Sequence, residues 1–268
     1  MLTFAQQMAF KAKKSLGQNF LYTKGPIISI CDASDIKSSD TVIEAGPGKG
    51  ILTEELLTRA GKVIVVEKDR LLIPFLEEKF SKEIKSGKLN ITEGDILKFE
   101  PQEHELKDGE YKIIANIPYY ITGAFFEYFL SNKTQPNLIS VLIQKEVAER
   151  IVRKDKKGSI LSVSVDAYGY PKYIKTVKKN LFRPAPKVDS AILAIENISR
   201  DKFEKNNVSE KDFFEVLKKG FAHKRKRLMK NLGTDENVFQ KLDVPQNIRA
   251  EELSTEKWFS LAKDLTTE

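Results

Sequence analysis

The sequence predicts a doubly wound α/β fold followed by a smaller helical part, and three observations support this. In the first two thirds of the 268 residues, short continuous apolar runs alternate with segments of helical periodicity. A glycine-rich turn joins the first apolar run directly to a helix. After about residue 198, apolar residues recur only at helical spacing. Apolar strands separated by helices are typical of a parallel sheet that is covered on both faces.

The expected elements follow in order along the chain. Continuous apolar runs predict strands at residues 41–45, 62–67, 89–93, 111–115 and 138–143. Helical spacing predicts helices at residues 51–59, 71–80 and 125–130. A proline-stiffened loop from Phe182 to Ser190 leads into another strand-like run at 191–195. Because residues 197–207 are polar and charged, we expect a linker there, with one domain at 1–199 and a small helical domain at 200–268.

Composition excludes several classes of protein. A single cysteine, Cys31, forms no internal disulfide, and with only His104 and His223 beside it we expect no metal site. The sequence has no apolar run near the roughly 18–20 residues of a membrane helix, and its first ten residues lack the order of a secretory signal. We therefore expect a cytoplasmic protein without membrane contact. No interface pattern is obvious, so a monomer is expected.

Positive charge is gathered in clusters. The 45 Lys plus Arg against 38 Asp plus Glu give a net charge of +7. Such clusters attract phosphate backbones, although each one taken alone is also typical of a solvated face. The residues that we expect to contact nucleic acid are Lys13, Lys14, Lys187, Lys224, Arg225, Lys226 and Arg227.

Glycines and a carboxylate follow the first two expected strands, where a doubly wound sheet binds its ligand. Gly46 begins the turn Gly-Pro-Gly-Lys-Gly, in which the backbone can approach a ligand closely. Glu67 ends the second strand, where a carboxylate can accept two hydrogen bonds from a ribose diol. These features predict a nucleoside-cofactor site; the alternative is a tight turn and a surface glutamate.

Two cofactor classes fit this pattern, NAD and S-adenosylmethionine. The third glycine comes one residue too early for the dinucleotide fingerprint. Glu44, beside the turn, would repel a diphosphate but attract the positive charge of a sulfonium group. These two observations favour S-adenosylmethionine.

The ends of the third and fourth strands carry further candidates. Asp95 can accept a hydrogen bond from an adenine amine, or it can cap a turn. In Asn116-Ile-Pro-Tyr119, the Asn116 side chain and the Ile117 carbonyl can accept from the amino group of a base, while Tyr119 offers a face for stacking. Phe182 can cover the opposite face of the base, or it can be a core residue.

Several motifs in the same order resemble the ribosomal RNA adenine N6,N6-dimethyltransferase family, and within it the bacterial small-subunit class associated with kasugamycin sensitivity. The matching stretches are residues 13–21, 42–53, 116–119, 144–148, 182–190 and 249–254. The Pro-Ala-Pro-Lys-Val loop and the Arg-Ala-Glu-Glu-Leu-Ser tail are more similar to the small-subunit class than to the large-subunit class that gives macrolide resistance.

The resemblance implies a Rossmann-like class I methyltransferase domain at 1–199 and an RNA-binding helical domain at 200–268. It implies S-adenosylmethionine contacts from Asn19, Leu21, Gly46, Glu67, Asp95 and Asn116. It implies target-base contacts from Asn116, Tyr119 and Phe182. The implied substrate is a pair of adjacent adenosines in the loop of the 3′-terminal hairpin of small-subunit (16S) rRNA, within an assembling 30S subunit.

Three alternatives stay open from the sequence. The chain can be a ribosome-assembly factor whose main work is binding, an enzyme of the large-subunit class, or a NAD-dependent oxidoreductase. The last requires a hydride-handling residue, for which the sequence offers no candidate.

Overall fold

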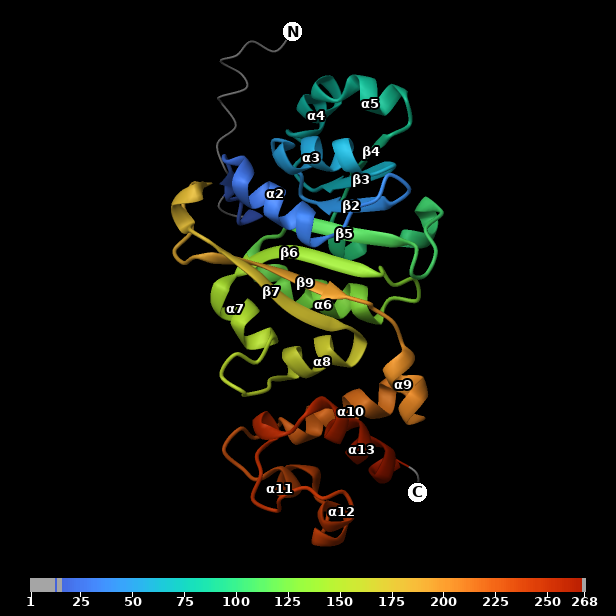
Figure 1. Ribbon diagram of the computed structural model, residues 1–268, viewed down its shortest axis with the longest axis vertical. Helices are drawn as coiled ribbons and strands as arrows, with labels where there is room; N and C mark the ends of the chain where they lie inside the picture. The colour runs from blue at the N-terminus through green and yellow to red at the C-terminus, as the bar shows by residue number, and fades with distance from the viewer. Residues whose placement is uncertain (1–12, 14–15, 267–268) are drawn as a thin grey trace.

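The computed structural model, which describes Lys13 and residues 16–266, has a seven-stranded sheet with helices on both faces (Figure 1). The strand order across the sheet is β4-β3-β2-β5-β6-β9-β7. Its strands are β2 (Thr41–Ala45), β3 (Lys62–Glu67), β4 (Leu89–Glu93), β5 (Tyr111–Asn116), β6 (Leu138–Gln144), β7 (Tyr170–Val177) and β9 (Ser190–Glu196). The order reverses at β2, with β3 on one side and β5 on the other, so β2 marks the switch point where such folds bind ligands.

The prediction of a parallel sheet is confirmed for the five strands on which it rested, but the sheet has two further, antiparallel strands at one edge. The strands from β4 to β6 pair in parallel, but β9 runs antiparallel to both β6 and β7. The sequence analysis missed β7, a half-exposed edge strand whose Lys172 and Lys175 interrupt any continuous apolar run. The chain returns from β7 to β9 through β8 (Phe182–Arg183) with no α-helix between them, so the two strands can pair antiparallel without a crossover.

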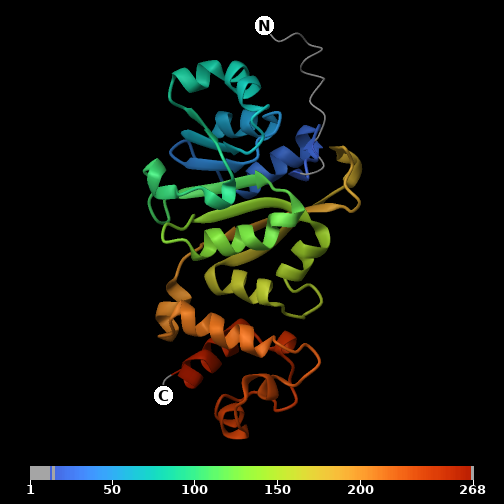
Figure 2. The ribbon, with the colours of Figure 1, turned by 180° about the vertical axis from the view of Figure 1, so that it is seen from behind.

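Alternating side chains of the central strands enter two separate apolar cores. Val42 packs on one side with Leu56, whereas Ile43 packs on the other with Phe125. Figure 1 shows α2 and α3 in front of the sheet, and the reverse view in Figure 2 shows α6 on the opposite face. The helices that cover the sheet are α2 (Lys24–Ala33), α3 (Ile51–Arg59), α4 (Ile73–Lys79), α5 (Ser81–Lys85), α6 (Thr122–Ser131), α7 (Lys145–Ile151) and α8 (Ile160–Tyr168).

Among the described residues, five α-helices follow the sheet and pack beneath α8 at one end of the molecule (Figure 1). They are α9 (Asp201–Asn206), α10 (Glu210–Gly220), α11 (Leu228–Leu232), α12 (Glu236–Lys241) and α13 (Thr255–Thr266). The predicted linker at 197–207 is wrong in part, because it contains α9 and the buried Phe203. The Phe203 ring lies 5.0 Å from the Tyr168 ring of α8 and 5.1 Å from the Phe259 ring of α13, so one apolar core continues from the sheet into these helices. The division at residues 199 and 200 stays a prediction.

A second, two-stranded sheet brings distant segments together near the carboxyl edge. Strand β1 (Phe20–Leu21) pairs antiparallel with β8 (Phe182–Arg183), so Leu21 lies opposite Phe182. Within the described part of the chain, no helix has both the length and the apolar character needed to cross a membrane.

Candidate active site

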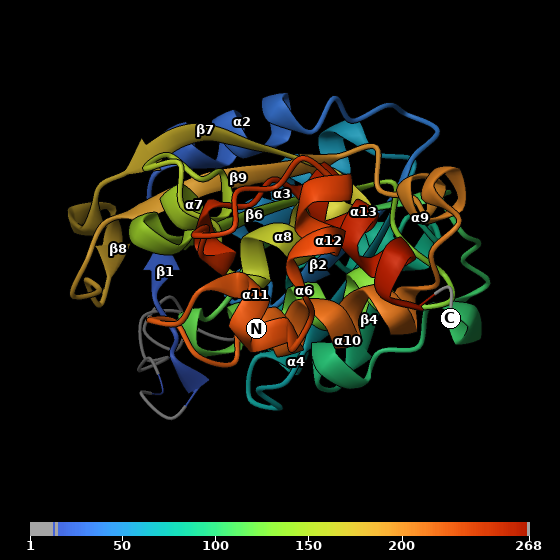
Figure 3. The ribbon, with the colours of Figure 1, turned by 90° about the horizontal axis from the view of Figure 1, so that it is seen from below.

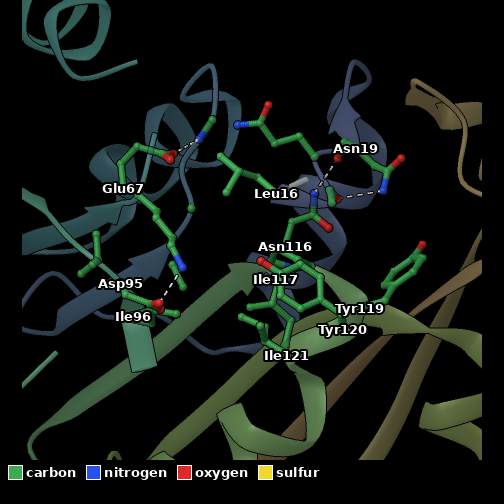
Figure 4. A pocket seen from close by; sticks show the side chains of 18 of the residues that line it. Leu16, Asn19, Glu67, Asp95, Ile96, Asn116, Ile117, Tyr119, Tyr120 and Ile121 are labelled. Carbon is green, nitrogen blue, oxygen red and sulfur yellow. Dashed lines mark hydrogen bonds and ion pairs between the residues drawn. The ribbon is translucent and has the colours of Figure 1, made fainter. Parts of the chain in front are cut away.

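A cavity at the carboxyl edge of the sheet collects the residues that follow four neighbouring strands (Figure 4). Gly46 follows β2, Glu67 ends β3, Asp95 lies two residues after β4, and Asn116 ends β5. All four line the cavity, as the sequence predicted from the geometry of parallel strands. Leu16 to Phe20, from outside the main sheet, form a further wall.

The glycine turn has a shape that side chains would block. Gly46 has a φ of +66°, and a Cβ added there would have no heavy atom within 4 Å. The turn therefore leaves space on the cavity side for a ligand to approach the backbone. Gly48, with a φ of +58°, instead packs against the ring of Phe20, which comes within 2.8 Å of where its Cβ would be.

Glu67 is a buried carboxylate with hydrogen-bonding capacity still available. Its Oε1 accepts from the backbone N–H of Asp69 at 2.7 Å, and its Oε2 accepts from that of Gly48 at 3.2 Å. Burial raises the pKa of Glu67, and the two backbone bonds oppose that shift. Each carboxylate oxygen has a second acceptor position, so the group can also receive hydroxyl donors from a ribose.

Asp95 caps a turn, which is one of the two roles that the sequence left open, and its contact with an adenine amine stays a prediction. Its Oδ1 accepts from the Leu97 N–H at 3.1 Å and so caps a short 3₁₀ helix (Ile96–Lys98), while its Oδ2 forms an ion pair with Lys68 at 2.7 Å. Burial alone would raise the pKa of Asp95, but these two partners hold it below its usual value. Asp95 is therefore an ionised acceptor on the cavity wall.

The orientation of the Asn116 amide is set by one hydrogen bond. Its Nδ2 donates to the carbonyl of Asn19 at 3.1 Å (Figure 4). Since the nitrogen is used in this bond, the Oδ1 atom is the end of the amide that is left to accept a hydrogen bond from a ligand. The Asn116 oxygen is thus available as an acceptor, and its contact with a base stays a prediction.

Tyr119 and Phe182 both line the cavity, from segments far apart in the sequence. The Tyr119 hydroxyl lies 2.7 Å from the hydroxyl of Ser190, which is fully buried at the start of β9. Burial raises the pKa of Tyr119, so its phenol stays neutral near pH 7. The sequence analysis gave Ser190 no role. The one available signal was its place at the end of the loop that begins at Phe182.

Several expected contributors differ from their predicted roles. The Leu21 side chain is buried in the core and does not line the cavity, so its cofactor contact stays a prediction. Glu44 is also buried, accepts from the Thr53 hydroxyl at 2.6 Å and does not line the cavity. Burial raises the pKa of Glu44 to about 8. The expected attraction between Glu44 and a sulfonium group is therefore wrong, because the carboxyl lies behind the turn and is mostly protonated near neutral pH.

The predicted nucleic-acid contacts divide into two groups. Lys13 forms an ion pair with Asp69 at 2.6 Å, and Lys14 lies outside the described residues. The others are exposed, and none is joined to an acidic side chain within the described part of the chain: Lys187, Lys224, Arg225, Lys226 and Arg227. Figures 1 and 3 show the loop between α10 and α11, which carries the last four, on the same side of the molecule as β8.

The cysteine and histidine residues that were considered for metal binding belong to no such site in the described part of the chain. Burial raises the pKa of Cys31 to about 12, so it is an inert core thiol. His104 stacks on the ring of Phe99, at 4.4 Å between centroids. Among residues 13 and 16–266, no group of three or more His, Cys, Asp or Glu side chains is arranged to hold a metal ion.

A family model described as ribosomal RNA adenine dimethylase matches residues 9–267. The chain belongs to the ribosomal RNA adenine dimethylase family. It is therefore an rRNA adenine dimethyltransferase, and the family's chemistry uses S-adenosylmethionine as methyl donor.

Relatives and solved structures match over most of the chain. A protein from Dehalococcoides mccartyi, named ribosomal RNA small subunit methyltransferase A, is 43% identical, over 94% of this chain and 87% of that one. A Fusobacterium nucleatum protein of the same name is 36% identical, over 96% and 98%. The crystal structure of a dimethyladenosine transferase from Plasmodium falciparum is 25% identical, with a TM-score of 0.76 over 90% and 95%. The 23S rRNA methyltransferase ErmE, at 24% identity and a TM-score of 0.75 over 92% and 99%, shares the fold.

Proposed function

We propose that this chain dimethylates N6 of two adjacent adenosines in the 3′-terminal hairpin loop of small-subunit rRNA. It does so as a cytoplasmic monomer acting on the assembling 30S subunit. The observation that carries the proposal is the oriented Asn116 amide, which lies beside Tyr119 in a cavity at the switch point of the sheet. The relatives named small subunit methyltransferase A support the choice of subunit.

The residues around the cavity fit S-adenosylmethionine. The open space at Gly46 gives a ligand room against the backbone of the turn, which a Cβ would fill. Glu67 has acceptor positions for a ribose diol, and Asp95 is an ionised acceptor for an adenine amine. Ile96 and Leu97 add apolar wall beside Asp95, as a flat purine requires.

Catalysis in this proposal is mostly positioning. Bound S-adenosylmethionine supplies an electrophilic methyl group. The adenine amine is a poor nucleophile because its lone pair is delocalised into the ring. Asn116 Oδ1 and the Ile117 carbonyl accept hydrogen bonds from its N–H groups, which draws electron density onto the nitrogen and orients the lone pair. Tyr119 and Phe182 hold the extruded base between their rings.

No strong base is required of the chain. The amine becomes acidic only after its nitrogen has gained the methyl group, and its proton then passes to solvent, so neutral oxygen acceptors are sufficient. A second transfer needs only one remaining N–H, which keeps one of the two acceptors. The phenol of Tyr119, neutral and bonded to Ser190, takes no part in proton transfer in this scheme.

The test is mass spectrometry of modified nucleosides after unmethylated small subunits are incubated with the chain and S-adenosylmethionine. The wild type is expected to form dimethyladenosine. Asn116→Ala should form none while RNA binding changes little, and Asn90→Ala, an exposed asparagine on β4, is the matched control with full activity. Absence of dimethyladenosine with the wild type, beside an active reference methyltransferase, would refute the proposal.

The same variants separate the alternative functions. If Asn116→Ala rescued a subunit-assembly defect as well as the wild type does, binding rather than methylation would be the main activity. If the modified nucleoside formed in large-subunit rRNA instead, the chain would belong to the macrolide-resistance class.

A further inference from the structure

The wall of the cavity formed by Leu16 to Phe20 lies outside the main sheet. Of this segment, only Phe20 belongs to a strand, β1, which pairs with β8 rather than with the main sheet. Nevertheless Asn19 from this wall holds Asn116 through its carbonyl. The position of the wall therefore determines the orientation of the Asn116 amide. The residues that hold the wall in place are thus important for the proposed reaction.

One carboxylate, Asp69, fastens the segment to the main domain. Its Oδ1 accepts from Lys13 Nζ at 2.6 Å, and its Oδ2 accepts from Gln18 Nε2 at 3.1 Å. The Lys13 backbone N–H in turn donates to Gln18 Oε1 at 2.8 Å, so the three residues form a closed set of bonds, which we call the clasp. Asp69 is 6% exposed, which makes loss of its partners costly.

The clasp is joined to both functional ends of the cavity. On one side, the Asp69 N–H donates to Glu67, the carboxylate with room for a ribose. On the other side, Gln18 is followed directly by Asn19, whose carbonyl accepts from Asn116. A shift of Gln18 would move that carbonyl and release the amide, which could then present its Nδ2 donor to the base in place of its Oδ1 acceptor.

We infer that Lys13, Gln18 and Asp69 are positioning residues for methyl transfer, because they hold the carbonyl of Asn19 where it orients Asn116. This inference rests on the proposed function. It also replaces the predicted role of Lys13 as a phosphate contact, since its ammonium group is bonded to Asp69. The low pKa of Asp69 agrees with this: burial would raise it, but the bonds from Lys13 and Gln18 hold it below its usual value.

The two roles of Lys13 predict different measurements. A phosphate contact contributes about 0.7–0.9 to the slope of log affinity against log salt concentration, and its loss weakens RNA binding. A positioning residue leaves that slope unchanged and lowers the rate of methyl transfer at saturating RNA. Because the segment is also a cavity wall, we expect S-adenosylmethionine affinity to fall with the rate.

The experiment compares Lys13→Met, Lys13→Arg, Asp69→Asn and the double variant Lys13→Met/Asp69→Asn in the full chain. Single-turnover methyl transfer, S-adenosylmethionine affinity without RNA, and RNA affinity at several salt concentrations are measured for each. Lys37→Met is the matched control, because it removes an exposed ion pair of the same 2.6 Å length. Lys224→Gln serves as the reference for loss of an RNA contact, with a reduced salt slope.

The clasp predicts that Lys13→Met and Asp69→Asn each slow methyl transfer about tenfold, the size of a lost charge-assisted hydrogen bond. The double variant should be no slower than either single variant, since one interaction is removed in all three. Lys13→Arg should restore most of the rate, which general damage to the fold would not allow.

Two results would overturn the clasp. One is a Lys13→Met variant with the wild-type rate at saturating RNA and a salt slope reduced like that of Lys224→Gln. The other is a pair of single variants whose effects add in the double variant. Either result, obtained with a wild type that forms dimethyladenosine, leaves the proposed function intact, whereas an inactive wild type refutes that function itself.

Discussion

Removal of the Ser190 hydroxyl is expected to slow methyl transfer about fivefold without unfolding the protein. Ser190→Ala deletes the 2.7 Å bond that fixes the Tyr119 ring. A neutral hydrogen bond contributes roughly 0.5–1.5 kcal/mol net, and ~1 kcal/mol of lost orientation corresponds to about a fivefold change in rate. Tyr119→Ala, which removes the stacking face itself, should cost more, about 1–3 kcal/mol.

The assay is a double-mutant cycle on single-turnover methyl transfer. Tyr119→Phe keeps the ring but removes the same bond, so Ser190→Ala and Tyr119→Phe should each be slow and the double variant no slower than the worse single variant. Their effect should appear in the rate at saturating RNA more than in RNA affinity. Additive losses, or Ser190→Ala with wild-type rate, would show that Ser190 does not position Tyr119.

Three further predictions address the turn, the buried acid and the basic loop. Gly46→Ala should weaken S-adenosylmethionine binding at least tenfold, because the added Cβ would occupy cavity space and the backbone φ of +66° is left-handed. Unchanged binding, measured by calorimetry, would show that the ligand does not approach the backbone at Gly46. Glu44 keeps its proton in the folded state up to about pH 8, whereas its pKa in the unfolded state is near 4.5. Between these two pH values the folded protein binds one proton more than the unfolded protein. The free energy of unfolding should therefore fall as the pH rises, by up to ~1.4 kcal/mol per pH unit. The free energy of unfolding of Glu44→Gln, measured with urea, should lack this pH dependence. If it changed with pH in parallel with that of the wild type, Glu44 would not be the cause. Lys224→Gln with Arg225→Gln should weaken RNA binding and reduce the salt slope by about 1.4–1.8; an unchanged slope would remove this loop from the RNA surface.

The sequence by itself determined the framework of the cavity. Apolar runs and helical spacing gave β2, α3, β3 and β4 with their observed bounds, because both periodicities are local properties of the chain. Parallel strands bring their carboxyl ends to one edge, so Gly46, Glu67, Asp95 and Asn116 could be expected together once the strands were placed. Edge strand β7 was missed, because Lys172 and Lys175 interrupt its apolar residues.

Only the tertiary structure decided how the catalytic side chains are held. Lys13 and Asp69 are 56 positions apart, and Tyr119 and Ser190 are 71 positions apart. No local pattern of apolar and polar residues can therefore predict either hydrogen bond. For the same reason, the charge of Lys13 suggested a phosphate contact, while its partner in the fold is a carboxylate. Burial of Glu44 behind the glycine turn likewise depends on helix α3, which brings Thr53 onto it. Local periodicity determines the helices and strands, whereas bonds between distant side chains depend on how those helices and strands pack against one another.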